Sequence, residues 1–116
     1  MTVKEEIVEL FSTANGIVYQ SNKSNRLVVE FNGDSTSFTI PCFFCLKKMV
    51  DSIDLEAMVS DPSPSADFEI IAPCGSDRCY VLSVQGVLDF RELLAGARAM
   101  LELNSIIYER LFSIPV

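Results

Sequence analysis

The stretch that organises this chain lies near its C-terminus and reads Leu88-Asp-Phe-Arg-Glu-Leu-Leu-Ala-Gly-Ala-Arg-Ala-Met-Leu-Glu-Leu-Asn-Ser-Ile-Ile-Tyr-Glu-Arg-Leu-Phe112. Asp89 can cap the N-terminus of a helix, and Glu92 follows at the spacing of a capping box. Leu88 and Leu93 are placed for a hydrophobic staple around that cap. One face then recurs at helical spacing: Phe90, Leu93, Leu94, Ala97, Leu101, Asn104, Tyr108 and Leu111. The pattern predicts an amphipathic helix over residues 88–112.

A second apolar flank widens this predicted helix toward its C-terminus. Met100, Leu103 and Ile107 lie to one side of the main face when the residues are placed at helical angles. The helix would be roughly 36 Å long, whereas a domain of this size has a radius of gyration of about 13 Å. One end is therefore expected to project, and an exposed apolar flank favours a partner surface. We predict that Met100, Leu103 and Ile107 form a dimer or partner interface; the alternative is that the rest of the chain covers the helix on two sides.

Composition limits the classes of function that the chain can have. Its 116 residues suffice for one domain, residues 1–116, with a core of its own. The net charge of −7, with only nine scattered Lys and Arg residues, argues against nucleic acid and anionic membranes as partners. The sequence contains no His, which removes His-dependent catalysis and His-bearing metal sites. No run has the length of a membrane span, and the acidic N-terminus is unlike a secretory leader, so a cytoplasmic protein with reduced cysteines is expected.

The remaining segments predict an α+β fold. Helical spacing at residues 2–14 predicts a first helix, and the Asn32-Gly33 pair predicts a hairpin turn between two strands. The predicted elements are helices at 2–14, 42–58 and 88–112 and strands at 17–20, 26–31, 35–40, 68–72 and 79–85, with a loop at 61–65 and a turn at 74–79. This order, α-β-β-β-α-β-β-α, predicts an antiparallel sheet of about five strands covered by helices.

The four cysteines have a suggestive spacing, with Cys42 and Cys45 in one half of the chain and Cys74 and Cys79 in the other. Four thiolates can hold zinc, although Cys42 and Cys45 open an apolar helix rather than a metal-binding turn. The same pair at a helix N-terminus could support thiol–disulfide chemistry, and Cys74 and Cys79 could form a hairpin disulfide outside a reducing compartment. The alternative is that Cys42 and Cys45 are core residues on the face of Leu46. No cofactor is predicted.

Two resemblances bear on function. The segment from Phe90 to Ile107, following a strand, resembles the end of a family of short uncharacterised proteins from Bacteroidetes. That family often carries a C-x-x-C pair in its first hairpin, where this chain has Ser21 and Ser24. The order of elements and the acidic composition are similar to class I type III secretion chaperones, which are dimers that bind extended segments of secreted effectors. The second resemblance implies a dimer with a protein partner.

The leading functional hypothesis is a small protein-binding or adaptor module that forms a homodimer through its C-terminal helix. No nucleophile elbow or P-loop identifies a catalytic residue, so an enzyme is not favoured. Two alternatives remain open: a thiol-based metal or redox protein that uses the four cysteines, and a binder of secreted effectors that resembles the chaperones.

Overall fold

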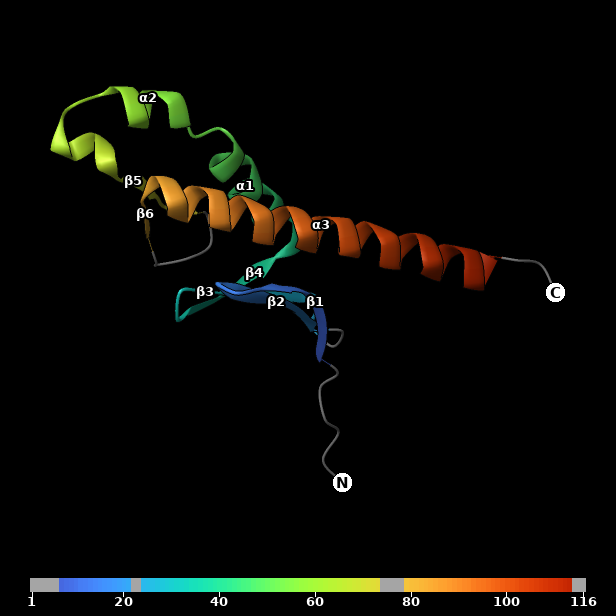
Figure 1. Ribbon diagram of the computed structural model, residues 1–116. Helices are drawn as coiled ribbons and strands as arrows, with labels where there is room; N and C mark the ends of the chain where they lie inside the picture. The colour runs from blue at the N-terminus through green and yellow to red at the C-terminus, as the bar shows by residue number, and fades with distance from the viewer. Residues whose placement is uncertain (1–6, 22–23, 74–78, 114–116) are drawn as a thin grey trace.

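A computed structural model describes the backbone of residues 7–21, 24–73 and 79–113, and their side chains except those of residues 64–65 and 106–113. The elements in chain order are β1 (Ile7–Thr13), β2 (Gly16–Ser21), β3 (Arg26–Phe31), β4 (Asp34–Thr39), α1 (Ile40–Asp51), α2 (Leu55–Ser60), the 3-10 turn η1 (Pro64–Asp67), β5 (Glu69–Ile71), β6 (Tyr80–Leu82) and α3 (Val84–Ser113). Figure 1 shows α3 lying across the molecule, with the larger sheet on one side of it.

The predicted α+β class is confirmed, with helices packed against antiparallel sheets. Strands β1 to β4 form one four-stranded sheet in chain order, and β5 and β6 form a separate two-stranded sheet. The prediction of a single sheet of about five strands is therefore wrong in this respect. Strands β5 and β6 have three residues each and pair with one another, from Glu69 opposite Leu82 to Ile71 opposite Tyr80.

The helix predicted at residues 2–14 is also wrong, because residues 7–13 form strand β1 and residues 2–6 lie outside the described part of the chain. The register of β1 against β2 shifts between Glu9 and Phe11, so Leu10 is the extra residue of a β-bulge. Leu10 is buried and Phe11 packs against α3. Two consecutive residues thus face the core, which breaks the alternation of a strand and imitates helical spacing.

The hairpin predicted at Asn32-Gly33 is confirmed. Strand β3 has the predicted bounds, and it pairs with β4 from Arg26 opposite Thr39 to Phe31 opposite Asp34. Asn32 and Gly33 both have positive φ angles, 50° and 89°. Asn and Gly adopt such angles at low cost and thereby match the twist of the two strands.

The helix predicted over residues 42–58 is divided into α1 and α2. Thr39 caps α1 by accepting a hydrogen bond from the Cys42 backbone N–H at 3.3 Å, and Asp54 caps α2 by accepting one from Ala57 N–H at 3.0 Å. Helix α1 therefore ends at Asp51, and a second helix begins after the cap at Asp54. The buried residues of α1 are Phe43, Leu46 and Val50.

Helix α3 begins four residues before the predicted start, and Ser83 is the capping residue. The Ser83 side-chain oxygen accepts a hydrogen bond from Gly86 N–H at 3.1 Å. The predicted cap, Asp89, lies inside the helix and accepts a hydrogen bond from Gln85 Nε2 at 2.9 Å. The predicted cap and staple are therefore wrong. Glu92 stands at the same spacing after Asp89 but within the continuous helix.

The core is centred on Phe90 in α3. Its ring stacks on Phe31 of β3 with centroids 4.2 Å apart, and it contacts Tyr80 of β6 at 4.9 Å. The α3 face predicted to be apolar is confirmed as far as its side chains are described. Fully buried residues on it are Val87, Phe90, Leu93, Leu94 and Ala97, and Met100 and Leu101 are partly buried against the same core. Phe90 therefore joins both sheets to the helix.

A close contact between β1 and α3 occurs at Gly96. A Cβ atom added at Gly96 would overlap the ring carbons of Phe11, so the ring occupies the space that any other residue would need. This contact fixes the position of α3 along its own axis relative to β1.

Replacement of Gly96 by Ala is expected to lower the free energy of unfolding by about 1–3 kcal/mol, because the Phe11 ring must move. The sign is unusual, since Gly→Ala within a helix ordinarily stabilises it by up to about 1 kcal/mol. Gly86→Ala in the same helix is the control, because an added Cβ there meets no atom closer than 3.4 Å. Urea unfolding followed by circular dichroism measures both. Equal effects of the two substitutions would contradict the prediction.

The C-terminal part of α3 extends past the strands of the larger sheet (Figure 1). Helix α3 has 30 residues, which at the rise of an α-helix makes it about 45 Å long. The strands along which it packs, β1 and β2, have seven and six residues, or about 23 Å at most. The expected projection of one end of the helix is therefore present.

Candidate functional site: an apolar groove beneath the projecting helix

A groove lies where α3 passes the start of β1 and the end of β2 and begins to project beyond the larger sheet. Its volume is about 590 Å³, within the range of sites that hold small ligands or side chains of a partner. Strands β1 and β2, the first turns of α1 and the middle of α3 contribute its walls. The lining residues are Val8, Gln20, Ile40, Phe44, Leu101, Glu102, Asn104 and Ser105.

The register of the sheet explains why Val8 and Gln20 line the groove. They stand opposite one another across β1 and β2, so their side chains lie on the same face. This is the face that carries Val18 of the core toward α3. Val8 precedes the bulge at Leu10, where the strand is still regular. The strand therefore presents an apolar side chain at the edge of the sheet under the helix.

The start of α1 supplies the second wall. Ile40 is the first residue of α1, and Phe44 is one turn later on the same face. Two of the apolar side chains that line the groove are accessible to a binding partner, since Val8 is 40% exposed and Phe44 is 38% exposed. The polar side of the groove comes from Gln20, and from Asn104 beyond Leu101 on α3.

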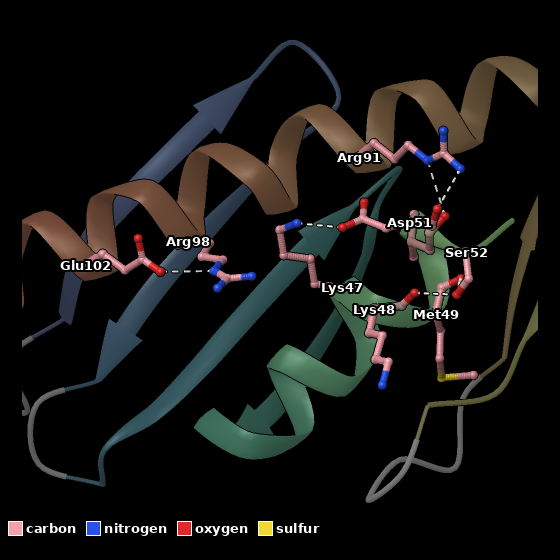
Figure 2. Close-up of polar contacts among 9 residues, drawn as sticks. Lys47, Lys48, Met49, Asp51, Ser52, Arg91, Arg98 and Glu102 are labelled. Atoms are coloured by element: carbon pink, nitrogen blue, oxygen red, sulfur yellow. Dashed lines mark hydrogen bonds and ion pairs between the residues drawn. The ribbon is translucent and has the colours of Figure 1, made fainter.

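Arg98 of α3 holds Phe44 at the rim. Its guanidinium carbon lies 5.5 Å from the centre of the Phe44 ring, a cation–π distance. Its Nε atom donates a hydrogen bond to Glu102 Oε1 at 3.0 Å, as Figure 2 shows. Glu102, the only carboxylate among the described residues that line the groove, is thus paired with a cation from the same helix. The groove can therefore receive apolar groups without an unpaired charge facing them.

Arg91 joins α1 to α3 and so fixes the distance between two walls of the groove. Its Nε donates to the Val50 carbonyl at 3.2 Å, and its Nη2 donates to the carbonyls of Asp51 and Ile53 at 3.1 and 2.7 Å. Figure 2 shows the side chain pointing at the end of α1. A cation at a helix C-terminus satisfies carbonyls that have no partner within the helix and interacts favourably with the dipole.

The predicted interface residues have different environments. Leu103 is 46% exposed and is next to the groove-lining residues Glu102 and Asn104 along α3. Met100 is partly buried against the core, so only part of its side chain can contact a partner. The side chain of Ile107 lies outside the described residues. Leu103 is thus the member of the predicted set that the helix presents to solvent.

The cysteines do not converge in the part of the chain that the structure describes. Cys42 is partly buried and Cys45 is exposed on α1, whereas Cys79 is exposed just before β6. Cys74 lies outside the described residues. Within residues 7–21, 24–73 and 79–113, no three Cys, Asp or Glu side chains gather where they could hold a metal ion.

The alternative prediction, that Cys42 and Cys45 are both core residues, is wrong for Cys45, because its side chain is exposed. Helix α1 is turned so that Phe43 and Val50, rather than Cys45 and Met49, complete the buried face with Leu46. Two phenylalanines stand between the two cysteines, and burial of Phe43 removes more apolar surface from water than burial of Cys45.

Sequence reasoning missed two groups of site residues. Val8 and Gln20 were missed because residues 2–14 were predicted to be a helix, whereas residues 7–13 form a strand that pairs with β2. The available signal was the run of Thr13-Ala-Asn-Gly16, which suits a turn between strands. Arg91 was missed because its partners lie 38 to 41 residues earlier in the chain. Phe44 lies at the rim of the groove, next to Arg98.

Comparison of the chain with protein-family models, with curated proteins and with solved structures found no match. Among the helices in the described ranges, none combines the length and apolar character needed to cross a membrane. The site must therefore be interpreted from its own chemistry.

Proposed function

We propose that this protein is a small cytoplasmic protein-binding module that forms a homodimer through the projecting part of α3. The observation that carries the proposal is the exposure of Leu103 on a helix that continues beyond the sheet on which it packs. A helix in water keeps an apolar flank where a neighbouring surface covers it. A second copy of the chain would supply that surface symmetrically, as in most homo-oligomers.

The groove supports a protein partner rather than a charged small molecule. Its described lining combines apolar side chains with the amides of Gln20 and Asn104. Glu102, the carboxylate among these described residues, is paired with Arg98. Such a lining can accept apolar side chains while amides orient the backbone of a bound segment. No nucleophile or metal-binding cluster accompanies it among the described residues, so we propose binding and not catalysis.

Replacement of Leu103 by Glu tests the homodimer. Two apolar side chains near a two-fold axis would become two like charges, and we expect the dimer to weaken by about 2 kcal/mol or more, roughly 30-fold. Native mass spectrometry and light scattering of the full reduced chain measure the change in subunit mass. Leu88→Glu is the matched control, because Leu88 is on the same helix at nearly equal exposure, 45% against 46%. Leu88→Glu should leave the dimer intact.

Three outcomes would contradict the proposal. The first is a wild-type chain that remains monomeric over the accessible concentration range. The second is a Leu103→Glu variant that is as dimeric as the wild type. The third is a Leu103→Glu variant that loses its circular-dichroism signal as a monomer, because that result would place Leu103 in the core rather than at an interface.

A further inference from the structure

Positive charge gathers beside the apolar groove in a chain that is acidic as a whole. The net charge is −7, and the sequence contains only nine Lys and Arg residues. Three of these nine, Lys47, Lys48 and Arg98, line a second hollow of about 360 Å³ together with Phe44 and Asp51. Phe44 also lines the apolar groove, so the two hollows adjoin at its ring. The groove therefore has a cationic end.

The helical spacing of α1 places these cations next to Phe44. Lys47 and Lys48 follow Phe44 by three and four residues, so the three side chains lie on one side of the helix. Arg98 reaches the same ring from α3, with its guanidinium carbon 5.5 Å from the ring centre. Cations from two helices thus converge on one aromatic side chain that separates the apolar part from the cationic part.

One of the three cations has no carboxylate partner. Lys47 forms an ion pair with Asp51, and Arg98 forms one with Glu102. Within the described part of the chain, no side chain forms an ion pair or hydrogen bond with the Lys48 ammonium group. Figure 2 shows this group extending away from the Lys47–Asp51 pair. Three cations and two carboxylates leave a net charge of +1 at this end of the groove.

We propose that the groove binds an extended segment of another protein, in which an apolar residue is followed or preceded two positions away by Asp or Glu. The apolar side chain would pack against Val8, Phe44 and Leu101. The carboxylate would pair with Lys48 and accept a hydrogen bond from Lys47, whose ammonium group has three donors. This inference rests on the protein-binding function proposed above and names the chemistry of the bound segment.

The spacing within the segment follows from the geometry of α1. Lys48 lies about one turn beyond Phe44, a rise of about 6 Å. Side chains two residues apart on an extended segment point to the same side and are separated by about 6.6 Å. An apolar side chain at Phe44 therefore places the next side chain of the same face at Lys48. The net charge of −7 opposes a long acidic tail, so we expect one or two carboxylates.

The proposed homodimer leaves the groove available for this segment. Leu101 lines the groove, whereas Leu103 is the exposed residue of the proposed dimer flank. Two residues correspond to about 200° around a helix, so the two leucines lie on nearly opposite sides of α3. A second copy that covers Leu103 therefore does not need to cover the groove.

Synthetic peptides provide the test on the full reduced chain. The probes are the capped five-residue peptide Leu-Ser-Leu-Ser-Glu and its reverse sequence, which sample both chain directions. Peptides with Gln in place of Glu are the matched controls, because they differ in charge alone. We expect the better acidic peptide to bind about tenfold more tightly than its Gln counterpart, as a charge-assisted contact predicts. NMR titration measures the affinities, and shifted amides at Phe44 and Leu101 would locate the peptide in the groove.

Lys48→Gln in the chain tests the contact from the other side. Because Lys48 is exposed, the substitution should preserve the fold and weaken the acidic peptide about threefold, without changing the affinity of the Gln peptide. Leu88→Glu is the control, since it changes the net charge of the chain by the same one unit at an exposed position on α3 outside the groove. Both peptides should bind Leu88→Glu as they bind the wild type.

Three results would overturn the inference, and each leaves a different account of the protein. Equal binding of the Glu and Gln peptides in the groove would retain a protein-binding site without a preference for acidic segments. Binding to Leu103→Glu but not to the wild type would assign the groove to the second copy. No saturable binding of either acidic peptide to either protein would remove the partner segment, while the homodimer would still be decided by its own mass measurement.

Discussion

Phe90→Ala is expected to lower the free energy of unfolding by about 3–5 kcal/mol, the range found for large aromatic residues removed from a well-packed core. Phe90 is fully buried and contacts an aromatic ring in each sheet, Phe31 at 4.2 Å and Tyr80 at 4.9 Å. Its removal would leave a cavity where, among the described residues, α3 and both sheets meet through aromatic rings. A loss of this size is a large fraction of the total free energy of unfolding of a small domain.

Urea unfolding monitored by circular dichroism measures the effect, with Leu88→Ala as control. Leu88 lies on the same helix two residues earlier and is 45% exposed, so its truncation should cost less than about 1 kcal/mol. Phe90→Leu should fall between the two, because it retains apolar volume but loses the ring contacts. A loss below about 1 kcal/mol for Phe90→Ala would show that this ring is not the centre of the core.

Arg91→Ala is expected to cost about 2–3 kcal/mol, because it removes a cation from three backbone carbonyls at the end of α1. Arg91→Lys should recover only part of the loss, since a single ammonium group lacks the planar arrangement of donors that reaches Val50, Asp51 and Ile53 together. Chemical denaturation of the two variants measures both values. The loss should leave the fold recognisable by circular dichroism, since the apolar core is unchanged.

Arg98→Ala is the control for Arg91. Arg98 lies on the same helix, but its side chain is half exposed and its partners are Glu102 and the exposed ring of Phe44. Exposed pairs of this kind contribute about 0–1 kcal/mol. Equal losses for Arg91→Ala and Arg98→Ala would contradict the role of Arg91 in joining α1 to α3.

Local sequence signals predicted those elements whose partners are close in the chain. The alternation in residues 26–31 and the Asn32-Gly33 turn fixed β3 and its hairpin, because both depend on neighbouring residues alone. The spacing of Phe90, Leu93, Leu94 and Ala97 likewise identified the buried face of α3. Each of these signals lies within one helix, one strand or one turn.

The remaining features depend on contacts between distant segments. The bulge at Leu10 placed two neighbouring residues, Leu10 and Phe11, against the core, and this gave β1 the spacing of a helix. The groove forms only because residues 7–13 are a strand, so the predicted helix at residues 2–14 gave no reason to place Val8 in a binding site. The exposure of Leu103 agreed with the predicted flank of α3, whereas the burial of Met100 depends on what packs beside it.

The contact between Gly96 and Phe11 has a consequence for how this protein can change during evolution. Gly96 sets the axial position of α3 on β1. The distance by which α3 projects beyond the sheet therefore depends on the number of residues that follow Gly96, 113 − 96 = 17. Insertion or deletion of whole turns after Gly96 would lengthen or shorten that reach by about 5.4 Å per turn without altering the core. The length of the projecting part of α3 can therefore change during evolution while the core of the domain remains the same.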